Sequence, residues 1–256
     1  MRCMRGSSAF VVYAAILVCS VEGTYASLLV RQSQYRPYGY GETNWSATTA
    51  AINMATGKQV TVVADFANAT QVNSADALWI DLGQVFNGVL SPPEIANIAN
   101  FIDSGRRVVM FGDNSNWESW NNSILSLVGG TFSSFNTHDV AYTAVNNSLT
   151  AGVSTIFVSQ GGGEAGVATE GTQLFDQNVA TLWNSNVLTI LDVNLFSNEW
   201  LGGEDNTRFM HNVVDWVTSS PGSVVPEPAT LFVWSGLGLA AACSYYAKKK
   251  RAHSQA

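Results

Sequence analysis

The stretch from residue 77 to residue 112 decides the fold, and it reads ALWIDLGQVFNGVLSPPEIANIANFIDSGRRVVMFG. Two apolar runs, residues 77–82 and 108–111, stand on either side of a helix signal. In that signal Ser91 and Glu94 have the spacing of a capping box, and Pro92 takes the first helical position. Apolar residues from Ile95 to Ile102 then recur on one helical face. Continuous apolar strands joined by an amphipathic helix predict a parallel sheet covered by helices.

The flanking sequence repeats this alternation in both directions. Strands are predicted at residues 27–32, 59–65 and 187–193, and the strand at 59–65 is expected to be buried. Helices are predicted at residues 44–56, 116–128 and 206–217. Between residues 132 and 158 the pattern is less regular and indicates only short strands. We therefore expect one α/β domain over residues 27–219, with three layers and a mostly parallel sheet.

Four segments in this order resemble the class I glutamine-amidotransferase-like fold, a flavodoxin-like three-layer sandwich. The first two are residues 77–83 and, after the Glu94 helix, residues 105–113. The other two, residues 147–153 and 191–216, resemble the later half of non-catalytic and trehalose-utilisation-like relatives. The resemblance extends over residues 27–219 and implies a flavodoxin-like ectodomain.

The resemblance also implies where a catalytic cysteine would stand. The enzymes of this family place it between glycines on a sharp strand-to-helix turn, and the matching turn here is Phe111-Gly112-Asp113-Asn114-Ser115, which has no cysteine. Glutamine hydrolysis by that route is excluded. Ser115 would need a nearby base to replace the cysteine, and neither His138 nor His211 lies in a recognisable motif, so we assign no catalytic residue.

Acidic and amide residues stand at the carboxyl ends of most predicted strands, where open α/β sheets bind ligands. They are Asp65, Asp81, Asp113, Asn114, Asp192 and Asn194, and loops could add Glu42, Glu118, Glu204 and Asp205. Their oxygen atoms could bind a hard cation such as calcium or hydrogen-bond to sugar hydroxyls, but such residues also form turns and cap helices. None has the fixed spacing of a calcium loop, so we assign no metal and no cofactor and keep calcium as an alternative only.

Two functions are compatible with this rim. A binding or scaffolding domain without catalysis fits the missing cysteine. The alternative is a sugar-acting hydrolase that would use Asp81, Asp113, Glu118 and Asp192. It requires two carboxyl groups that face each other across a deep cleft, with the pKa of one of them raised. Carboxylates that cap helices on a shallow rim would favour the scaffold.

The amino end has the composition of a secretory signal peptide. Arg2 and Arg5 precede an apolar stretch at residues 9–19, and Thr24-Tyr25-Ala26 supplies small residues for signal peptidase. We predict a signal peptide over residues 1–26, cleaved after Ala26, and passage through the Sec translocon.

The carboxyl end predicts a membrane segment between two short motifs. Residues 229–247 form an apolar run of 19 residues without a charged side chain, long enough as a helix to cross a bilayer of roughly 30 Å. The tripeptide Pro226-Glu227-Pro228 precedes the run, and the cations Lys248, Lys249, Lys250 and Arg251 follow it. Because such cations resist translocation, residues 252–256 are expected to form a cytoplasmic tail. Residues 220–225 are a linker.

This arrangement at residues 226–251 resembles the PEP-CTERM sorting signal of Gram-negative envelope and exopolysaccharide-associated proteins. The resemblance implies recognition by an exosortase, a membrane-embedded cysteine transpeptidase, and cleavage near the tripeptide. The alternative is a plain C-terminal anchor that is never cut. In either case the domain before Pro226 is expected outside the cytoplasmic membrane, in the envelope or beyond it.

Composition limits the partners. Residues 27–225 hold six Lys or Arg and 17 Asp or Glu, a net charge of −11, which disfavours nucleic acid and anionic membranes. Cysteine occurs only at positions 3, 19 and 243, so this region has no thiol for a disulfide, a metal site or catalysis. Seven tryptophans remain in it; we expect most of them in the core, while stacking on a polysaccharide is the alternative.

Overall fold

A computed structural model describes residues 26–136, 140–158 and 164–219. Its main element is a seven-stranded sheet in the order β2-β1-β3-β4-β11-β10-β9. The first five strands are parallel and the last two antiparallel. Their bounds are β1 Leu28–Arg31, β2 Val60–Val63, β3 Ala77–Ile80, β4 Arg107–Phe111, β9 Thr172–Gln173, β10 Ala180–Trp183 and β11 Val187–Ile190. The parallel strands have the 2-1-3-4-5 order of flavodoxin-like folds, which confirms the predicted α/β class.

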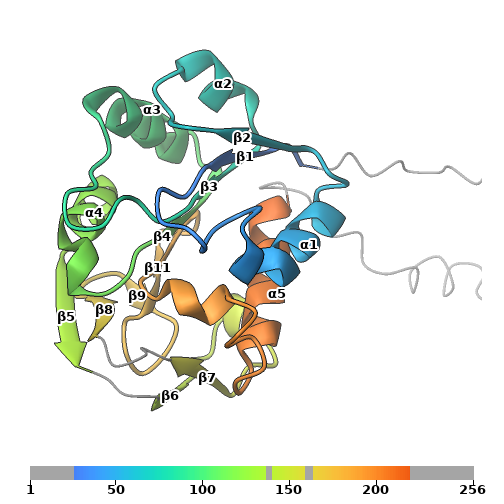
Figure 1. Ribbon diagram of the computed structural model, residues 1–256, viewed down its shortest axis with the longest axis vertical. Coiled ribbons are helices and arrows are strands. Elements are labelled where there is room, and N and C mark those ends of the chain that lie inside the picture. Colours follow the sequence, from blue (N-terminus) through green and yellow to red (C-terminus); the bar gives the residue numbers. More distant parts are fainter. Residues whose placement is uncertain (1–25, 137–139, 159–163, 220–256) are drawn as a thin grey trace, which may run out of the picture.

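Helices cover both faces of the sheet (Figure 1). On one face α1 (Ser46–Ala55) packs against α5 (Asn206–Thr218), and on the other lie α2 (Ala69–Ser74), α3 (Pro92–Asp103) and α4 (Glu118–Leu125). Short 3-10 turns extend the helices or replace them: η1 Thr43–Trp45, η2 Ser115–Trp117, η3 Ser126–Val128, η4 Ser148–Thr150 and η5 Val193–Phe196. The capping box of Ser91 and Glu94 is present at the start of α3, as its spacing predicts.

A segment between α4 and β11 builds two small antiparallel sheets. One pairs β5 (Phe132–Asn136) with β8 (Glu164–Ala168), and the other pairs β6 (Val140–Thr143) with β7 (Thr155–Val158). The segment then supplies β9 and β10 to the main sheet. The strands β8, β9 and β10 were not predicted, because they are short and lack a clear apolar period.

The core on the α1/α5 face is aromatic. The ring of Trp45 lies 4.9 Å from that of Phe111, and the ring of Trp79 lies 5.0 Å from Phe111 and 6.4 Å from Phe196. Five of the seven tryptophans of residues 27–225 are buried, on one face of the sheet or the other. The expectation that most of them belong to the core is therefore confirmed. The five are Trp45, Trp79, Trp117, Trp120 and Trp183.

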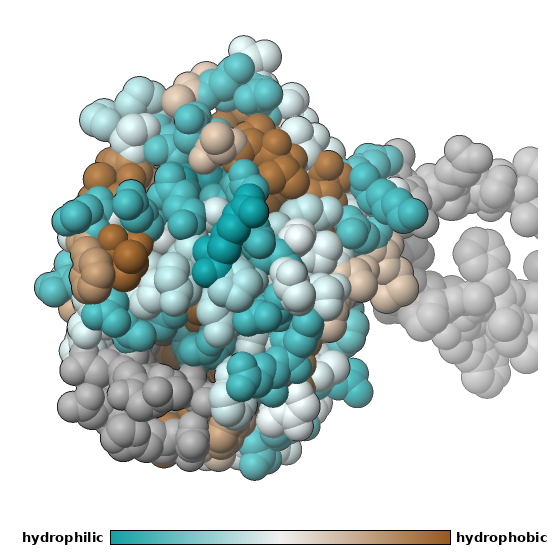
Figure 2. Space-filling model, in the orientation of Figure 1, coloured by the Kyte–Doolittle hydropathy of each residue, from teal (hydrophilic) through white to brown (hydrophobic). Residues whose placement is uncertain are grey.

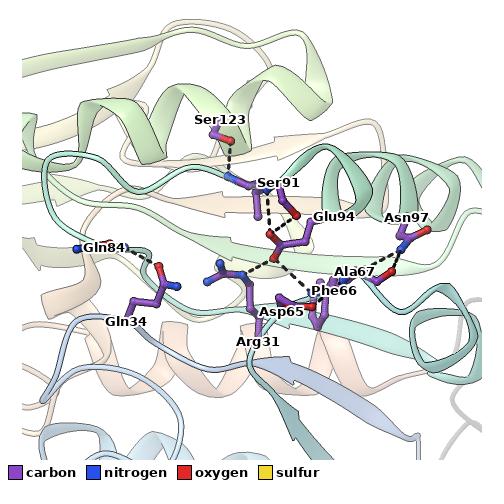
Figure 3. A network of polar contacts seen from close by, with 11 residues as sticks. Arg31, Gln34, Asp65, Phe66, Ala67, Gln84, Ser91, Glu94, Asn97 and Ser123 are labelled. Carbon is purple, nitrogen blue, oxygen red and sulfur yellow. Dashed lines mark hydrogen bonds and ion pairs between the residues drawn. The ribbon is translucent and has the colours of Figure 1, made fainter.

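A buried ion pair holds the opposite face together (Figure 3). Nε of Arg31, at the end of β1, donates to Oε1 of Glu94 in α3 over 2.8 Å, and both side chains are almost fully buried. The Arg31 guanidinium also lies over the ring of Trp120, 4.9 Å from its centroid. The second carboxylate oxygen of Glu94 accepts from the backbone N–H and the hydroxyl of Ser91, each at 2.9 Å. One carboxylate therefore joins β1 to the start of α3.

The strand β2 differs from its prediction. Its apolar sequence predicted burial, yet β2 is the edge of the sheet, with Thr61 and Val62 exposed. The rest of the surface in view is mostly hydrophilic, with separate hydrophobic clusters (Figure 2).

The predicted segments at the two ends are not part of this description. Residues 1–25 of the signal peptide, the linker at 220–225, the sorting signal at 226–251 and the tail at 252–256 lie outside the described residues. Within the described ranges, no helix is long and apolar enough to cross a membrane.

Candidate functional site

Three aspartates stand buried at the carboxyl ends of adjacent parallel strands. Asp81 follows β3, Asp113 follows β4 and Asp192 follows β11, and each is at most 6% exposed. The register pairs Ile190 with Phe111, so Asp192 and Asp113, two residues further on, come out side by side. Because side chains alternate along a strand, all three carboxyl groups belong to the α1/α5 side of the sheet, the side of Trp79 and Phe111.

Asp81 is enclosed by its own chain. Its two oxygens accept hydrogen bonds from the backbone N–H of Tyr40 and from Nε1 of Trp79, both at 2.8 Å. Gly39, with φ of +128°, lies so close that a Cβ there would stand 2.9 Å from the carboxylate. Burial raises the pKa of Asp81 to about 7, against the lowering effect of those two hydrogen bonds. The loop between β1 and α1 thus fills the crevice between β1 and β3, where flavodoxin-like folds bind ligands.

Asp113 and Asp192 lie close enough for the charge of Asp113 to act on Asp192. Burial raises the pKa of Asp113 to about 7, and the Asn114 N–H opposes this at 2.8 Å. Burial, followed by the charge of Asp113, raises the pKa of Asp192 well above its usual value. Oδ2 of Asp192 is buried and has no hydrogen-bond partner among the described residues, which suits a protonated acid better than a carboxylate.

The turn that carries Asp113 is held between α4 and β8. Asn121, fully buried in α4, accepts from the Asp113 N–H at 3.1 Å and donates to the Asp113 carbonyl at 2.6 Å. On the other side β8 crosses the turn, because a Cβ on Gly166 would stand 2.4 Å from the same carbonyl. The Gly166 N–H also donates to the Leu191 carbonyl at 3.3 Å. The turn therefore carries a buried carboxyl group between α4 and β8.

One amide and two acidic residues of the predicted rim cap local turns. Asn114 accepts from the Asn116 N–H at the start of η2. Asp192 accepts from the Asn194 N–H at the start of η5, and the side chains of these two residues also interact. Asp65 accepts from the Ala67 N–H at 2.9 Å. These contacts are the helix-capping role that favours a scaffold.

The remaining predicted rim residues lie outside the buried cluster, although the charge of Glu42 adds to the burial that raises the pKa of Asp81. Glu42 pairs with the exposed Arg36 at 3.1 Å, and Glu118 is exposed in the first turn of α4. Glu204 and Asp205 bind the β6–β7 hairpin instead, where Asp205 accepts from the Ser154 N–H at 2.7 Å.

The aromatic loop above the strand ends was not among the predicted site residues. The half-buried rings of Tyr35 and Tyr38 are parallel within 4°, with centroids 6.0 Å apart, and Tyr35 meets the edge of Trp117 at 4.8 Å. Burial raises the pKa of Tyr38, whose hydroxyl interacts with the side chain of Asn44. Three tyrosines directly after the first strand of an α/β fold were the available signal.

Three cavities in the described part of the chain are lined by other residues than the buried aspartates. One of about 600 Å³ lies between α1 and α5 and is lined in part by Met54, Leu201 and His211. Two others, of about 530 and 80 Å³, lie near the end of α5 and between β1, β2 and α2. No group of three or more His, Cys, Asp or Glu side chains suited to a metal occurs within the described ranges. His138, named above as a candidate base, lies outside those ranges.

Comparison with known proteins places the fold but not the activity. No family model matches the chain, and no curated protein matches its sequence. Among solved structures, the N-terminal domain of mmIFT52 has a TM-score of 0.57 at 11% identity, with 76% of this chain and 99% of that one covered. A GMP synthase-like protein from Thermoplasma acidophilum has a TM-score of 0.50 at 10% identity, covering 75% and 94%. The chain therefore has a glutamine amidotransferase-like α/β fold, and identities this low show the fold alone.

Proposed function

We propose that this chain is an exported, exosortase-processed protein of the cell envelope or extracellular matrix whose domain binds or scaffolds without catalysing. The observation that carries the non-catalytic part is the β4–α4 turn. This is the turn that the resemblance matches to the cysteine turn of the enzymes. It carries Asp113, whose side chain is buried and whose backbone is enclosed by Asn121 and β8. The turn has no cysteine, and its hydroxyl residue, Ser115, is exposed at the start of η2. Export rests on the two terminal segments of the sequence.

The surface best suited to a ligand is the aromatic loop rather than the aspartates. The partly exposed rings of Tyr35 and Tyr38 offer flat faces, and Asn114 and Asn194 nearby along the strand ends are also partly exposed. Aromatic faces with amide hydrogen-bonding groups suit the rings and hydroxyls of a polysaccharide.

Tyr38→Ala is expected to weaken retention on a neutral exopolysaccharide at least roughly tenfold, a loss of about 1.4 kcal/mol. Tyr38→Phe is the matched control, because it keeps the ring and removes only the hydroxyl. Affinity electrophoresis against a panel of purified polysaccharides measures the effect. Equal retention of the parent and Tyr38→Ala on every polysaccharide would refute the aromatic loop as the binding surface.

Sorting is tested by the intact mass of the protein recovered from a Gram-negative host that carries an exosortase. We expect the mass of a polypeptide that begins at Ser27 and ends near Pro226-Glu227-Pro228. Glu227→Ala should leave the carboxyl end uncut and the protein in the inner membrane. Lys58→Ala, a change to an exposed cation inside the domain, should leave processing unchanged. An uncut parent chain in that host would show that the segment is a plain anchor.

The raised pKa values of Asp113 and Asp192 are the one observation that favours a sugar-acting hydrolase, since paired carboxyl groups can share a proton. Their burial opposes it, because side chains that are at most 6% exposed are not open to a sugar. Turnover of a glycoside by the purified protein, abolished by Asp113→Asn, would establish the hydrolase and overturn the non-catalytic proposal.

A further inference from the structure

The edge strand β2 has the composition of an interior strand and the exposure of a surface one. All four residues of β1, of β3 and of β11 are buried, whereas β2, with the sequence Val-Thr-Val-Val, exposes its two central residues. Val62 is 44% exposed. Figure 2 shows hydrophobic residues over the part of the molecule where Figure 1 draws β1 and β2. The helices of the domain leave this strand partly uncovered.

The outer edge of β2 also offers backbone hydrogen bonds. The Leu28 N–H donates to the Gln59 carbonyl at 3.0 Å and the Gln32 N–H to the Val63 carbonyl at 2.9 Å. The groups that face β1 therefore belong to Gln59, Thr61 and Val63, and those of Val60 and Val62 point away from the sheet. In the described part of the chain β2 pairs only with β1. No proline, bulge or charged residue within β2 protects this edge, although natural edge strands usually carry one.

We propose that this edge binds a second copy of the chain, with the two β2 strands antiparallel about a two-fold axis. The charges at the two ends of β2 indicate that the partner is a second β2 strand in antiparallel orientation. Lys58 stands just before β2 and Asp65 just after it, both exposed. Antiparallel pairing brings Lys58 of each copy to the end that holds Asp65 of the other, whereas parallel pairing would set like charges together at both ends.

The same charges limit the register. The backbone N–H and C=O groups of Val60 and Val62 that point away from the sheet must face the corresponding groups of the partner strand. In addition, Lys58 must come near Asp65 of the partner. Two registers satisfy both conditions, one centred on Thr61 and one centred on Val62. The contact joins the two sheets into one and covers the apolar edge. Because a single short strand contributes from each copy, we expect a reversible dimer. The inference does not depend on export or on a polysaccharide ligand.

Cysteine cross-linking in the full chain tests the proposal. With Cys3, Cys19 and Cys243 changed to serine, a single cysteine is introduced by Thr61→Cys or by Val62→Cys. Under mild oxidation one of the two is expected to form a covalent dimer, since directly opposed strand residues lie within disulfide range. The matched control is Gln173→Cys in β9, the exposed strand at the opposite edge of the same sheet. Dimer yields from both β2 positions no higher than that of Gln173→Cys would overturn the proposal.

Exchanging the charges of Lys58 and Asp65 distinguishes specific pairing of the β2 strands from cross-linking by random collision of two molecules. Lys58→Glu in the cross-linking background is expected to lower the dimer yield at least severalfold, and Lys58→Glu combined with Asp65→Lys to restore it. Melting curves of each variant show whether the domain is still folded. A folded Lys58→Glu chain that cross-links as well as its parent would equally overturn the antiparallel arrangement.

Discussion

Replacing Glu94 with alanine is expected to lower the free energy of unfolding by about 3–5 kcal/mol. The change leaves the buried Arg31 guanidinium without its anion, and it removes the acceptor of the Ser91 and Phe66 N–H groups. Burial alone would raise the pKa of Glu94, but hydrogen bonds from Arg31 and Ser91 lower it below its usual value, so the side chain is ionised in the folded state. Urea unfolding followed by tryptophan fluorescence measures the loss.

Glu118→Ala is the matched control for Glu94→Ala. Both residues are acidic and stand in the first turn of a helix, but Glu118 is exposed. Its loss should cost less than about 1 kcal/mol, which is the helix-dipole contribution common to both. In addition, Arg31→Met combined with Glu94→Gln should be more stable than Glu94→Gln alone, because it removes the unpaired charge. Similar costs for Glu94→Ala and Glu118→Ala would contradict the importance of the buried pair.

Much of this fold is visible in the sequence because its strands are continuous apolar runs and its helices carry caps. Residues 77–112 alone contain β3, the capping box of α3 and β4, and the late run at 187–193 contains β11. Alternation of such segments restricts the architecture to a few parallel topologies. The three strand-end aspartates were also visible, since a residue directly after an apolar strand belongs to the carboxyl edge of the sheet.

What the sequence could not supply depends on contacts between distant segments. Nothing local indicates that β8 would cross the Asp113 turn, or that Gly39 would close over Asp81. The sequence therefore left open whether the rim of carboxylates forms a cleft or only caps turns, and the structure buries its three strand-end aspartates. The apolar run of β2 likewise predicts a strand, but whether a strand lies inside or at the edge of a sheet depends on the connections of the whole domain.

Raising the pH from about 5 to about 8 is expected to destabilise the fold by roughly 2–5 kcal/mol. The pKa values of Asp81 and Asp113 are raised to about 7 in the folded protein, against about 3.9 in an unfolded chain. Such groups contribute their full stability below about pH 4 and lose it as the pH rises through about 7, at about 1.4 kcal/mol per pH unit for each carboxyl. Glu94, with its lowered pKa, stays ionised throughout this window.

Urea midpoints at the two pH values measure this loss, and Asp113→Asn should reduce the difference by removing one of the titrating groups. Asp65→Asn, a change to an exposed aspartate, should leave the difference unaltered. Equal midpoints at both pH values in the parent protein would mean that Asp81 and Asp113 are already ionised at pH 5. A flat profile would therefore remove the raised pKa that a sugar-acting hydrolase requires. A steep loss of stability above pH 5 is the expected result, because both carboxyl groups are buried in the folded protein.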